Sequence, residues 1–290
     1  MITNFYIKFY HIYGRISCID RKNVLYCMVK WYALRQGSQE RWKGEEQMDG
    51  FCDFHSHILP GMDDGCKTPE QSVEALRLSY AQGVRAIFAT PHYYPVESVE
   101  AFLARRQTAW ESLQAEIKKQ GATDIPQIVL GAEVAYRPGI SSAEGIEKLC
   151  LGSSAYLLLE LPFRAWGKEE LRQVNNFACV LGITPILAHY ERYRTLQSRE
   201  MYDQMARQDV LVQKNAEAFS GFFEERRACR EVKLGRCHLL GSDCHNLSSR
   251  KPNLSLAVES LRRRGMQKEL NHINKISWEI FFQANKESRG

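Results

Sequence analysis

Residues Asp53–Gly65 read DFHSHILPGMDDG, an apolar lead into two histidines and then a pair of aspartates. Side chains two apart on a strand project to the same face, so His55 and His57 are predicted to lie side by side. Two imidazoles in that arrangement can bind one metal ion, and Asp64 offers an oxygen ligand at the turn that follows. The alternative is a pair of surface or core histidines that are close only by chance.

From Phe51 onward the chain repeats one pattern, a short apolar run followed by a polar residue and then a helical segment. Further runs that fit buried strands lie at Val84–Thr90, Ile128–Leu130, Ala155–Leu159, Ile183–Ala188, Val210–Gln213 and Cys237–Gly241. Helices are predicted from Thr68 to Gly83, from Ser98 to Gln120, from Lys168 to Leu181, from Ser198 onward and over 217–234. Seven strand–helix units in one direction predict a parallel, barrel-like α/β fold.

Most strands of this pattern end at a residue that can bind a metal ion. In a barrel of this kind the functional residues lie at the carboxyl-terminal strand ends. The residues at or just beyond these ends are His55 with His57, His92, Glu133, Glu160, His189 and Asp243. Each one alone has an ordinary interpretation, as a solvent-facing carboxylate or as a core histidine bonded to a carbonyl. Together they predict one site.

Glu160 favours the metal interpretation, because it follows a strand that is apolar throughout and is therefore expected to be covered on both faces. An ionised carboxylate in such surroundings needs a partner, and a cation supplies one. The histidines and carboxylates at the strand ends outnumber the ligands of a single ion. Two or three divalent ions are therefore predicted.

Two arginines closely follow predicted ligands: Arg192 lies three residues after His189, and Arg250 lies seven residues after Asp243. A guanidinium fork matches a pair of phosphate oxygens, so both are candidates for binding and catalysis; the alternative for each is an ordinary surface arginine. The segment Cys244–Arg250 also has the C-x5-R spacing of thiol-based phosphatases. Its loop lacks the glycine that a phosphate-cradling nest favours, so we reject a thiol mechanism.

The composition of the 290 residues, 44% hydrophobic and 25% charged, is sufficient for a sizeable core. Of the net charge of +5, residues 1–47 carry +4, from eight Lys/Arg against four Asp/Glu, so the remainder is nearly neutral. A nucleic-acid-binding surface is therefore not indicated. Nine cysteines without CxxC spacing favour a reducing cytoplasm over a disulfide framework. No apolar run reaches the roughly 18 residues of a membrane span.

Residues 1–47 differ from the rest of the chain and have no clean helical or strand period. One interpretation is that translation begins at Met48, five residues before Asp53, and that the preceding stretch is an upstream or loosely ordered extension. The alternative is an arm that binds a membrane surface or a partner protein. The globular domain is predicted to span residues 48–290.

Six motifs in this order resemble those of the polymerase-and-histidinol-phosphatase (PHP) superfamily. They are HSHILPGxDDG from His55, ATPH from Ala89, GxE from Gly131, LELP from Leu159, AHxERY from Ala188 and SDxHN from Ser242. They are most similar to a bacterial branch of that superfamily, the capsular-polysaccharide tyrosine phosphatases that are CpsB/YwqE-like. The resemblance covers about Met48 to Arg264, and its motifs have the family's order and spacing.

The resemblance implies a distorted (β/α)7 TIM-like barrel, the PHP fold, with two or three divalent ions. The family usually uses Mn2+, and Zn2+, Fe2+ or Mg2+ are the alternatives. The implied metal ligands are His55, His57, Asp64, His92, Glu133, Glu160, His189, Asp243 and His245. Arg192 and Arg250 match the family's phosphate-binding arginines, and either Asp64 or His245 is expected to supply a proton. One departure is Tyr190, which replaces the family's usual proline and is expected to alter the pocket rim.

The implied activity is metal-assisted hydrolysis of phosphotyrosine, in particular on the tyrosine-rich tail of a bacterial tyrosine kinase that controls capsule or exopolysaccharide synthesis. Such a protein would act in the cytoplasm, without nucleic acid and without a membrane span, as a monomer or a homo-oligomer. Two alternatives stay open. One is a PHP-type phosphatase of a small molecule such as histidinol phosphate, and the other is a metal-stabilised module that binds the kinase without turnover.

Overall fold

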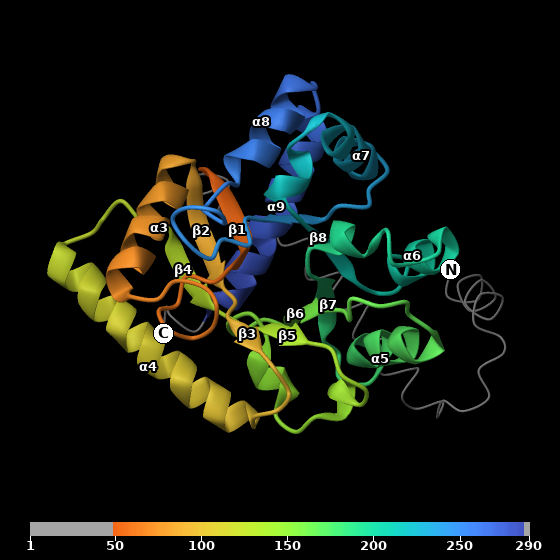
Figure 1. Cartoon of the computed structure of the whole chain (residues 1–290), viewed down its shortest axis with the longest axis horizontal. Coiled ribbons are helices and arrows are strands. Elements are labelled where there is room, and N and C mark those ends of the chain that lie inside the picture. The colour runs from red at the N-terminus through yellow and green to blue at the C-terminus, as the bar shows by residue number, and fades with distance from the viewer. Residues whose placement is uncertain (1–48, 287–290) are drawn as a thin grey trace, which may run out of the picture. The chain divides into compact units, whose positions relative to one another are not determined.

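The computed structural model describes residues 49–286, which belong to the compact unit Gln47–Gly290. The extension predicted for residues 1–47, with its alternatives and the start at Met48, lies outside the described residues. In Figure 1 the strands lie at the centre of this unit and the helices surround them.

Nine strand segments form the centre of the fold within residues 49–286. They are β1 (Phe51–Ser56), β2 (Val84–Ala89), β3 (His92–Tyr93), β4 (Gln127–Leu130), β5 (Glu133–Ala135), β6 (Tyr156–Glu160), β7 (Thr184–Leu187), β8 (Leu211–Asn215) and β9 (Leu239–Gly241). Their pairings are parallel, in two ladders with the orders β1-β2-β4 and β3-β5-β6-β7-β8-β9. Two residues separate β2 from β3, and two separate β4 from β5, so the nine segments follow seven strand paths.

The two ladders meet where the first strand lies beside the last. The Asp243 amide donates to the His55 carbonyl oxygen at 2.7 Å, and the His57 amide donates to the Cys244 carbonyl oxygen at 2.9 Å. The sheet therefore curls round on itself, which confirms the predicted parallel, barrel-like α/β fold. The ladder is interrupted between β2 and β3, where Pro91 lacks the amide hydrogen that a continuous strand would use.

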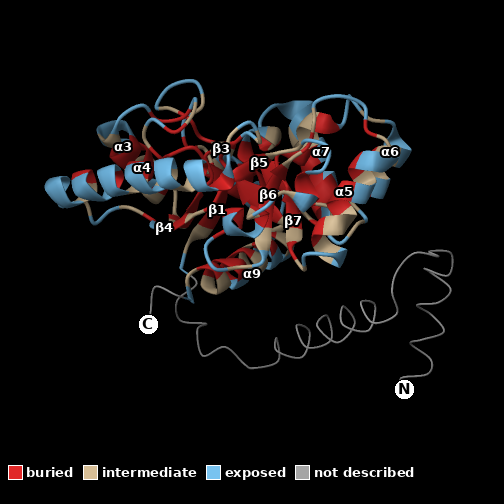
Figure 2. Cartoon of the chain, turned by 90° about the horizontal axis from the view of Figure 1, so that it is seen from below, coloured by how far each residue is buried: buried red, intermediate tan, exposed pale blue. Residues whose placement is uncertain are grey.

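Helices follow the strand paths along the chain. The α-helices are α3 (Pro69–Ala81), α4 (Val99–Gln120), α5 (Lys168–Cys179), α6 (Arg199–Met205), α7 (Phe222–Lys233), α8 (Ser255–Arg263) and α9 (Gln267–Ala284). The 3-10 helices are η2 (Ile140–Ser142), η3 (Ile146–Leu149), η4 (Tyr190–Tyr193) and η5 (Ala216–Phe219). In Figure 2 the strands are mostly buried, whereas α4 and α6 turn exposed faces to solvent. Among the described residues, no helix is both long and apolar enough to cross a membrane.

Side-chain caps begin three of these helices at the residues that the sequence predicts. Thr68, Ser98 and Ser198 each accept, through the hydroxyl oxygen, the amide hydrogen of the third residue on, at 3.1 to 3.3 Å. Each bond satisfies an amide that has no partner within its helix.

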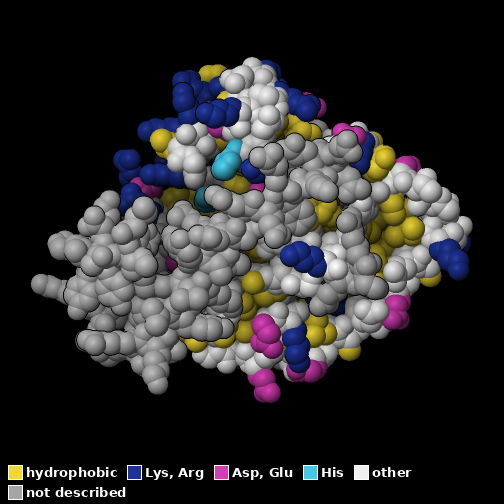
Figure 3. All heavy atoms as spheres, turned by 180° about the vertical axis from the view of Figure 1, so that it is seen from behind, with side chains coloured by type: hydrophobic (Ala, Val, Ile, Leu, Met, Phe, Trp, Pro, Cys, Tyr) yellow, Lys and Arg dark blue, Asp and Glu magenta, His cyan; other side chains and the backbone are white. Residues whose placement is uncertain are grey.

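Figure 3, which shows the side opposite to that of Figure 1, has many Lys and Arg side chains over the part of the molecule where α7 lies.

Two segments differ from the sequence prediction. The helix predicted over 217–234 is divided, because Gly221 takes a φ of +78° between η5 and α7. A glycine reaches that conformation easily, and it lies outside the helical range. The strand predicted to end at Gln213 continues to Asn215, which brings one more side chain to the carboxyl-terminal edge of the sheet.

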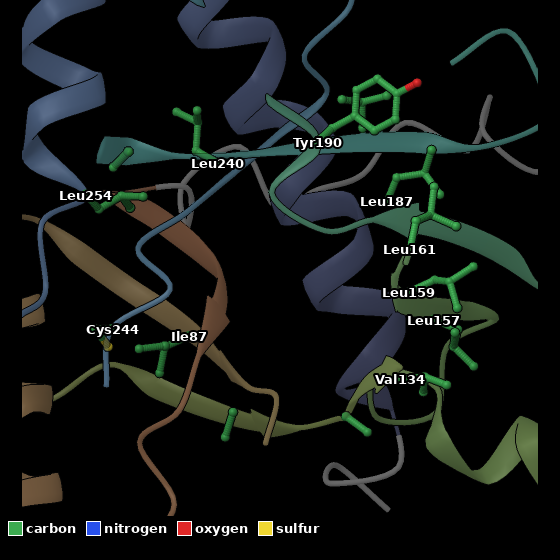
Figure 4. Close-up of a cluster of buried hydrophobic side chains, with 14 of the residues drawn as sticks. Ile87, Val134, Leu157, Leu159, Leu161, Leu187, Tyr190, Leu240, Cys244 and Leu254 are labelled. Carbon is green, nitrogen blue, oxygen red and sulfur yellow. The ribbon is translucent and has the colours of Figure 1, made fainter. Parts of the chain in front are cut away.

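The strands separate two apolar clusters. The inner cluster packs between the sheet and α9, and its large members include Phe54, Phe88, Leu158, Ile186, Trp278 and Phe281. The outer cluster packs between the sheet and the surrounding helices. Figure 4 shows its strand residues, among them Ile87, Val134, Leu157, Leu159, Leu187 and Leu240.

Helix α9 lies at the amino-terminal ends of the strands. Trp278 Nε1 and Asn274 Nδ2 donate to the carbonyl oxygen of Gly50, directly before β1, at 3.3 and 3.1 Å. The Ser153 amide, shortly before β6, donates to the Ala284 carbonyl oxygen at 3.0 Å. This helix covers the amino end with apolar side chains, so the polar residues of the strand paths collect at the other end.

Candidate active site

All nine residues predicted as metal ligands lie close together at the carboxyl-terminal ends of the strands. They form four overlapping groups, in each of which the candidate ligand atoms lie within 4.8 Å of one another. The groups are His57, Asp64, His92 and His245; His55, His57 and Asp243; His55, Glu133 and His189; and His92, Glu133 and Glu160. Residues that are distant in the sequence therefore share one centre.

Glu133, the first residue of β5, lies in the middle of this cluster. Its Oε2 atom lies 3.0 Å from His55 Nε2 and 3.3 Å from His57 Nε2. His92 Nδ1 approaches the same oxygen at 3.1 Å. Burial opposes the charged carboxylate, but the positive charge of His55 and hydrogen bonds from histidines hold the pKa of Glu133 well below its usual range. A buried carboxylate that stays charged can bind a cation, which compensates its negative charge.

His55 and His57 leave β1 side by side, as the sequence predicts. Their Nε2 atoms are 3.1 Å apart, so at least one of the two nitrogens presents a lone pair to the shared space. Although burial opposes protonation, hydrogen bonds to three carboxylates raise the pKa of His57 well above its usual value. A divalent ion would take the place of such protons among these ligands.

His189 follows β7 and joins two carboxylates from neighbouring strand paths. Its Nε2 atom lies 2.9 Å from Glu133 Oε1 and 3.4 Å from Glu160 Oε1. Although burial opposes its charge, the bonds to Glu133 and Glu160 raise the pKa of His189 to about 9. Glu160 therefore has a charged partner at the end of its apolar strand, as the sequence argument requires.

Asp243 follows β9 and lies between the two predicted phosphate-binding arginines. Arg192 Nη2 lies 2.7 Å from Asp243 Oδ2, and Arg250 Nη2 lies 2.8 Å from Oδ1. Although burial opposes its charge, the nearby histidines hold the pKa of Asp243 well below its usual range. The two arginine side chains are 34% and 38% exposed, so their remaining donors can reach a ligand from solvent.

Asp64 and His245 lie at the open edge of the cluster. Asp64 Oδ1 lies 3.3 Å from His245 Nε2 and 3.5 Å from His92 Nε2, although the Asp64 side chain is 63% exposed. Arg250 Nη1 lies 3.5 Å from Asp64 Oδ2. Burial, together with the positive charge of His57, lowers the pKa of His245 to about 4, which leaves its ring neutral near pH 7. A neutral imidazole is the form that binds a metal ion.

Several buried polar atoms of the cluster approach other ligand atoms without making a well-directed hydrogen bond. They include Glu133 Oε2 and His92 Nδ1, which lie 3.1 Å apart, and His245 Nε2, which lies 3.3 Å from Asp64 Oδ1. Buried polar atoms are normally paired, and leaving one unpaired costs about 1–3 kcal/mol. Their convergence among nitrogen and oxygen donors fits the binding of divalent cations.

The backbone is left-handed at two of these residues. His189 has a φ of +31° and Asp243 a φ of +53°, and no other non-glycine residue within 49–286 has a positive φ. Such conformations cost free energy and persist at sites where the surrounding structure holds them. Both residues follow strand ends, and the unusual φ is a feature of two predicted ligands.

Sequence reasoning missed Asp63, which orients a predicted ligand. Asp63 Oδ2 lies 2.7 Å from His57 Nδ1, and it accepts the His92 amide at 2.8 Å. Burial opposes its charge, but the bonds to His57 hold the pKa of Asp63 well below its usual range. The signal is present in the paired aspartates of the first motif, of which the sequence analysis predicts only Asp64 as a ligand.

Sequence reasoning also missed Gln213 and Asn215 on β8. Gln213 Oε1 accepts the His189 amide at 2.7 Å, and Gln213 Nε2 donates to Asn215 Oδ1 at 2.9 Å. Asn215 Nδ2 in turn donates to Asp243 Oδ2 at 2.8 Å. The available signal was the alternate spacing of Gln213 and Asn215, because such residues share one face once the strand extends two residues past its predicted end.

Two half-exposed aromatic rings flank the cluster. Tyr94 stacks on the His92 ring with centroids 5.2 Å apart, and Phe163 stacks on the His189 ring at 5.7 Å. Tyr94 is 49% exposed and Phe163 is 52% exposed. A planar ligand bound at the histidines would have aromatic surface within reach on both sides.

Tyr190 and Cys244 both point away from this cluster. Tyr190 is buried in the outer cluster, where its hydroxyl donates to the Tyr202 carbonyl oxygen at 2.6 Å (Figure 4). The expectation that Tyr190 alters the pocket rim is therefore wrong, because the side chain does not reach it. Cys244 is also in the outer cluster, and burial raises its pKa well above the usual value, which agrees with the rejection of a thiol mechanism.

Comparison with known proteins finds one matching family and several similar proteins. Residues 51–278 match the family described as capsular polysaccharide synthesis, CpsB/CapC. The tyrosine-protein phosphatase CpsB of Streptococcus pneumoniae is 33% identical over 231 residues, which cover 73% of this chain and 90% of that protein. The tyrosine-protein phosphatase YwqE of Bacillus subtilis (strain 168) is 29% identical over 217 residues, which cover 73% of this chain and 84% of that protein.

A solved structure supports the fold. It is described as one of the crystal structures of YwqE from Bacillus subtilis and CpsB from Streptococcus pneumoniae, "unique metal-dependent tyrosine phosphatases". It matches this chain with a TM-score of 0.65. The match has 24% sequence identity and covers 81% of this chain and 92% of that chain. Because the sequence identity is this low, the match supports the fold alone.

Proposed function

The chain belongs to the CpsB/CapC family of capsular polysaccharide synthesis, and we propose on that basis that it is a metal-dependent phosphatase of phosphotyrosine in proteins. The observation that carries the proposal is the cluster of nine candidate ligands beside two arginines that bind Asp243. A phosphate ester in hydrolysis needs cations on some of its oxygens and bidentate donors on others. This site offers both.

The nine clustered residues are proposed to hold two or three divalent ions, with Mn2+ as the preferred ion and Zn2+, Fe2+ or Mg2+ as alternatives. Such ions supply Lewis acidity, which neutralises phosphoryl oxygens and lowers the pKa of water. The buried atoms of His92, Glu133 and His245 that make no well-directed hydrogen bond support this assignment.

Arg192 and Arg250 are proposed to bind the phosphoryl group. Asp243 holds both guanidinium groups at 2.7 and 2.8 Å, so their orientation is set before a substrate arrives. Tyrosinate leaves with a conjugate-acid pKa of about 10, so it depends less on a proton donor than an alkyl alcohol does. Asp64, which is the more exposed of the two candidates, can exchange protons with solvent more readily than His245.

Tyr94 and Phe163 are proposed to contact the aryl ring of the substrate. Both rings are about half exposed and already stack on candidate ligands, so they border the space that a phenyl group would enter. This feature favours phosphotyrosine over histidinol phosphate, whose phosphate is carried on an alkyl chain. We expect Tyr94→Ala with Phe163→Ala to lower kcat/KM for an aryl phosphate about tenfold and to spare an alkyl phosphate.

The partner is proposed to be the tyrosine-rich tail of a bacterial tyrosine kinase that controls capsule or exopolysaccharide synthesis, in the cytoplasm. The family's description supports the pathway. Buried free thiols at Cys52, Cys66, Cys150, Cys229, Cys237 and Cys244 support a reducing compartment.

The decisive experiment is a phosphatase assay on the metal-stripped protein, restored one ion at a time. We expect p-nitrophenyl phosphate and a phosphotyrosine peptide to be hydrolysed only after a divalent ion is restored, with Mn2+ the most effective. If histidinol phosphate is turned over faster than the peptide, the substrate assignment changes from phosphotyrosine to a small-molecule phosphate. If the peptide binds but no ion supports its hydrolysis, the protein is a binding module and the phosphatase proposal is wrong.

A further inference from the structure

Two amide side chains on β8 connect residues of the metal cluster that come from different strand paths. They are Gln213 and Asn215, which are 0% and 2% exposed, and the chemistry proposed above assigns them no role. A buried amide is costly to leave unpaired, and its oxygen only accepts hydrogen bonds whereas its nitrogen only donates them. The partners of these amides therefore fix the direction of each bond.

The hydrogen bonds through the two amides run in one direction. The His189 backbone amide can only donate, so the Gln213 atom that faces it at 2.7 Å is the oxygen, Oε1. Gln213 Nε2 therefore faces the other way and donates to Asn215 Oδ1 at 2.9 Å. Asn215 in turn directs Nδ2 to Asp243 Oδ2 at 2.8 Å. Turning either amide over would place two donors or two acceptors face to face, so both orientations are determined.

The same Gln213 oxygen lies beside the first histidine of the cluster. It is 3.4 Å from His55 Nδ1, and within residues 49–286 it is the only hydrogen-bond partner of that nitrogen. Because this oxygen accepts, it favours the ring form that carries hydrogen on Nδ1. In the neutral ring the lone pair is then on Nε2, which lies 3.0 Å from Glu133 Oε2 and 3.1 Å from His57 Nε2. Gln213 thus directs the lone pair of His55 toward the centre of the cluster.

A glycine on the neighbouring strand leaves the room that this contact needs. Gly241 pairs with Asn215 in the register of β8 and β9. A side-chain carbon at position 241 would lie 2.6 Å from Gln213 Nε2 and 2.7 Å from His55 Cβ, both well inside normal contact distance. The Gln213 amide and His55 therefore pack directly against the backbone of β9, which holds the two side chains close together.

We propose that Gln213 is a positioning residue, which sets the hydrogen of His55 on Nδ1 and so prepares Nε2 to bind a metal ion. The inference deepens the proposed function, on which it rests for the binding of metal ions by the cluster. Gln213 is not itself a candidate ligand. It acts through His55, because a hydrogen bond to the outer nitrogen of a metal-binding imidazole fixes both the tautomer and the orientation of the ring.

The test separates hydrogen bonding from packing by means of variants of similar size. Gln213→Met removes every polar contact of the side chain. Gln213→Glu is the conservative variant, because it keeps an oxygen toward the His189 amide and His55 Nδ1. The matched control is Gln173→Met. Gln173 is also buried, but its oxygen accepts from Ser141 and none of its bonds involves the cluster.

The first readout is the position of the ring hydrogen of His55 in the metal-stripped full chain. Proton–nitrogen correlation NMR of the histidine rings measures it, with the His55 signals identified by their absence from His55→Gln. At a pH that leaves the ring neutral, we expect hydrogen on Nδ1 in the wild type, in Gln213→Glu and in the control, and a mixture of both tautomers in Gln213→Met.

Hydrogen on Nε2 of His55 in the wild type would overturn the proposal, and this measurement stands by itself if Gln213→Met does not fold. An unchanged tautomer in folded Gln213→Met would also overturn it, because the amide would then only fill space.

The second readout is the affinity for Mn2+, measured by calorimetry. We expect Gln213→Met to weaken it about 10- to 100-fold, and Gln213→Glu and the control to stay within about threefold of the wild type. Equal weakening in Gln213→Met and Gln213→Glu would contradict the role of the oxygen. Failure of the proposed function would be visible separately, as absence of p-nitrophenyl phosphate hydrolysis with every ion, whereas the His55 tautomer is measured without metal.

Discussion

The two ends of the barrel are equally buried but opposite in chemistry. At the amino end, Trp278 and Phe281 of α9 are at most 3% exposed and wholly or largely apolar. At the carboxyl end, His55, His57 and Glu133 are at most 1% exposed and ionisable. Burial of apolar area stabilises the fold, whereas burial of charge opposes it unless a partner compensates. Stability and chemistry are therefore expected to depend on different residues, and this separation can be tested.

The largest effect is expected from Asp243→Asn at the carboxyl end. The substitution removes a candidate ligand and the charge that binds both arginines. We expect kcat/KM for p-nitrophenyl phosphate to fall by about 100- to 1,000-fold, with a melting temperature close to that of the wild type. The matched control is Asp124→Asn, which breaks only an exposed pair with Arg77. Unchanged activity of Asp243→Asn would contradict the assignment of the site.

The converse effect is expected from Phe281→Ala at the amino end. Its ring packs in the inner cluster against Phe88 and Trp278, so truncation leaves a cavity. We expect the free energy of unfolding to fall by about 3–5 kcal/mol, with kcat/KM unchanged in protein that remains folded. Phe222→Ala removes a ring that is 64% exposed and should change neither quantity. Loss of activity without loss of stability in Phe281→Ala would show that the two ends are coupled.

An intermediate effect is expected from Asp63→Asn, which removes a charge from beside the site without removing a candidate ligand. Asp63 bonds His57 Nδ1 at 2.7 Å, and this bond orients the ring. We expect the affinity for Mn2+ to weaken about 10- to 100-fold, with activity recovered at high metal concentration. Titration of the metal-stripped protein, followed by activity and by calorimetry, measures this. Asp209→Asn, at an exposed position, is the control.

The smallest effect is expected from a charged cluster that lies away from the site. Glu225 of α7 accepts bonds from Arg264, Ser260 and Arg263 around α8, and these bonds lower its pKa to about 2. Because the folded pKa is below the unfolded value of about 4.3, the cluster stabilises the protein above that pH and loses its contribution as the pH falls toward 2.

We therefore expect Glu225→Gln to lower the free energy of unfolding by about 1 kcal/mol at pH 7, with kcat/KM unchanged. The difference from the wild type should shrink as the pH falls below about 4 and vanish near pH 2. Urea unfolding at several pH values measures it, with Glu224→Gln as the neighbouring exposed control. A difference that grows toward low pH would contradict the linkage.

Most of the barrel could be predicted from sequence because each strand path is a short apolar run that ends at a polar residue. The candidate ligands follow from the same pattern, since parallel strands bring their carboxyl ends to one edge. Asp63 was missed because two adjacent aspartates look alike until the fold turns one toward His57. Gln213 and Asn215 were missed because their partners, His189 and Asp243, come from other strand paths.

Other features depend on packing between distant segments and have no local signal. The division of the helix predicted over 217–234 depends on one φ value at Gly221, which a helical period does not reveal. The ion pair between Arg236, which follows α7, and Asp203 of α6 needs the two helices to lie side by side, and the two residues are 33 positions apart in the chain. Sequence patterns predict elements and strand ends well, but they do not predict which helix faces meet.

On the proposed assignment of the site, the contact between β1 and β9 also sets the moment at which the protein becomes active. His55 and His57 emerge early in synthesis, whereas Asp243 and His245 emerge near its end, and backbone hydrogen bonds join the two segments directly. A partly translated chain therefore lacks one member of each of two ligand groups, and with Asp243 it lacks the residue that holds both arginines. If these residues act as proposed, catalysis begins only after the last strand has left the ribosome and docked on the first, so turnover reports that this docking has taken place.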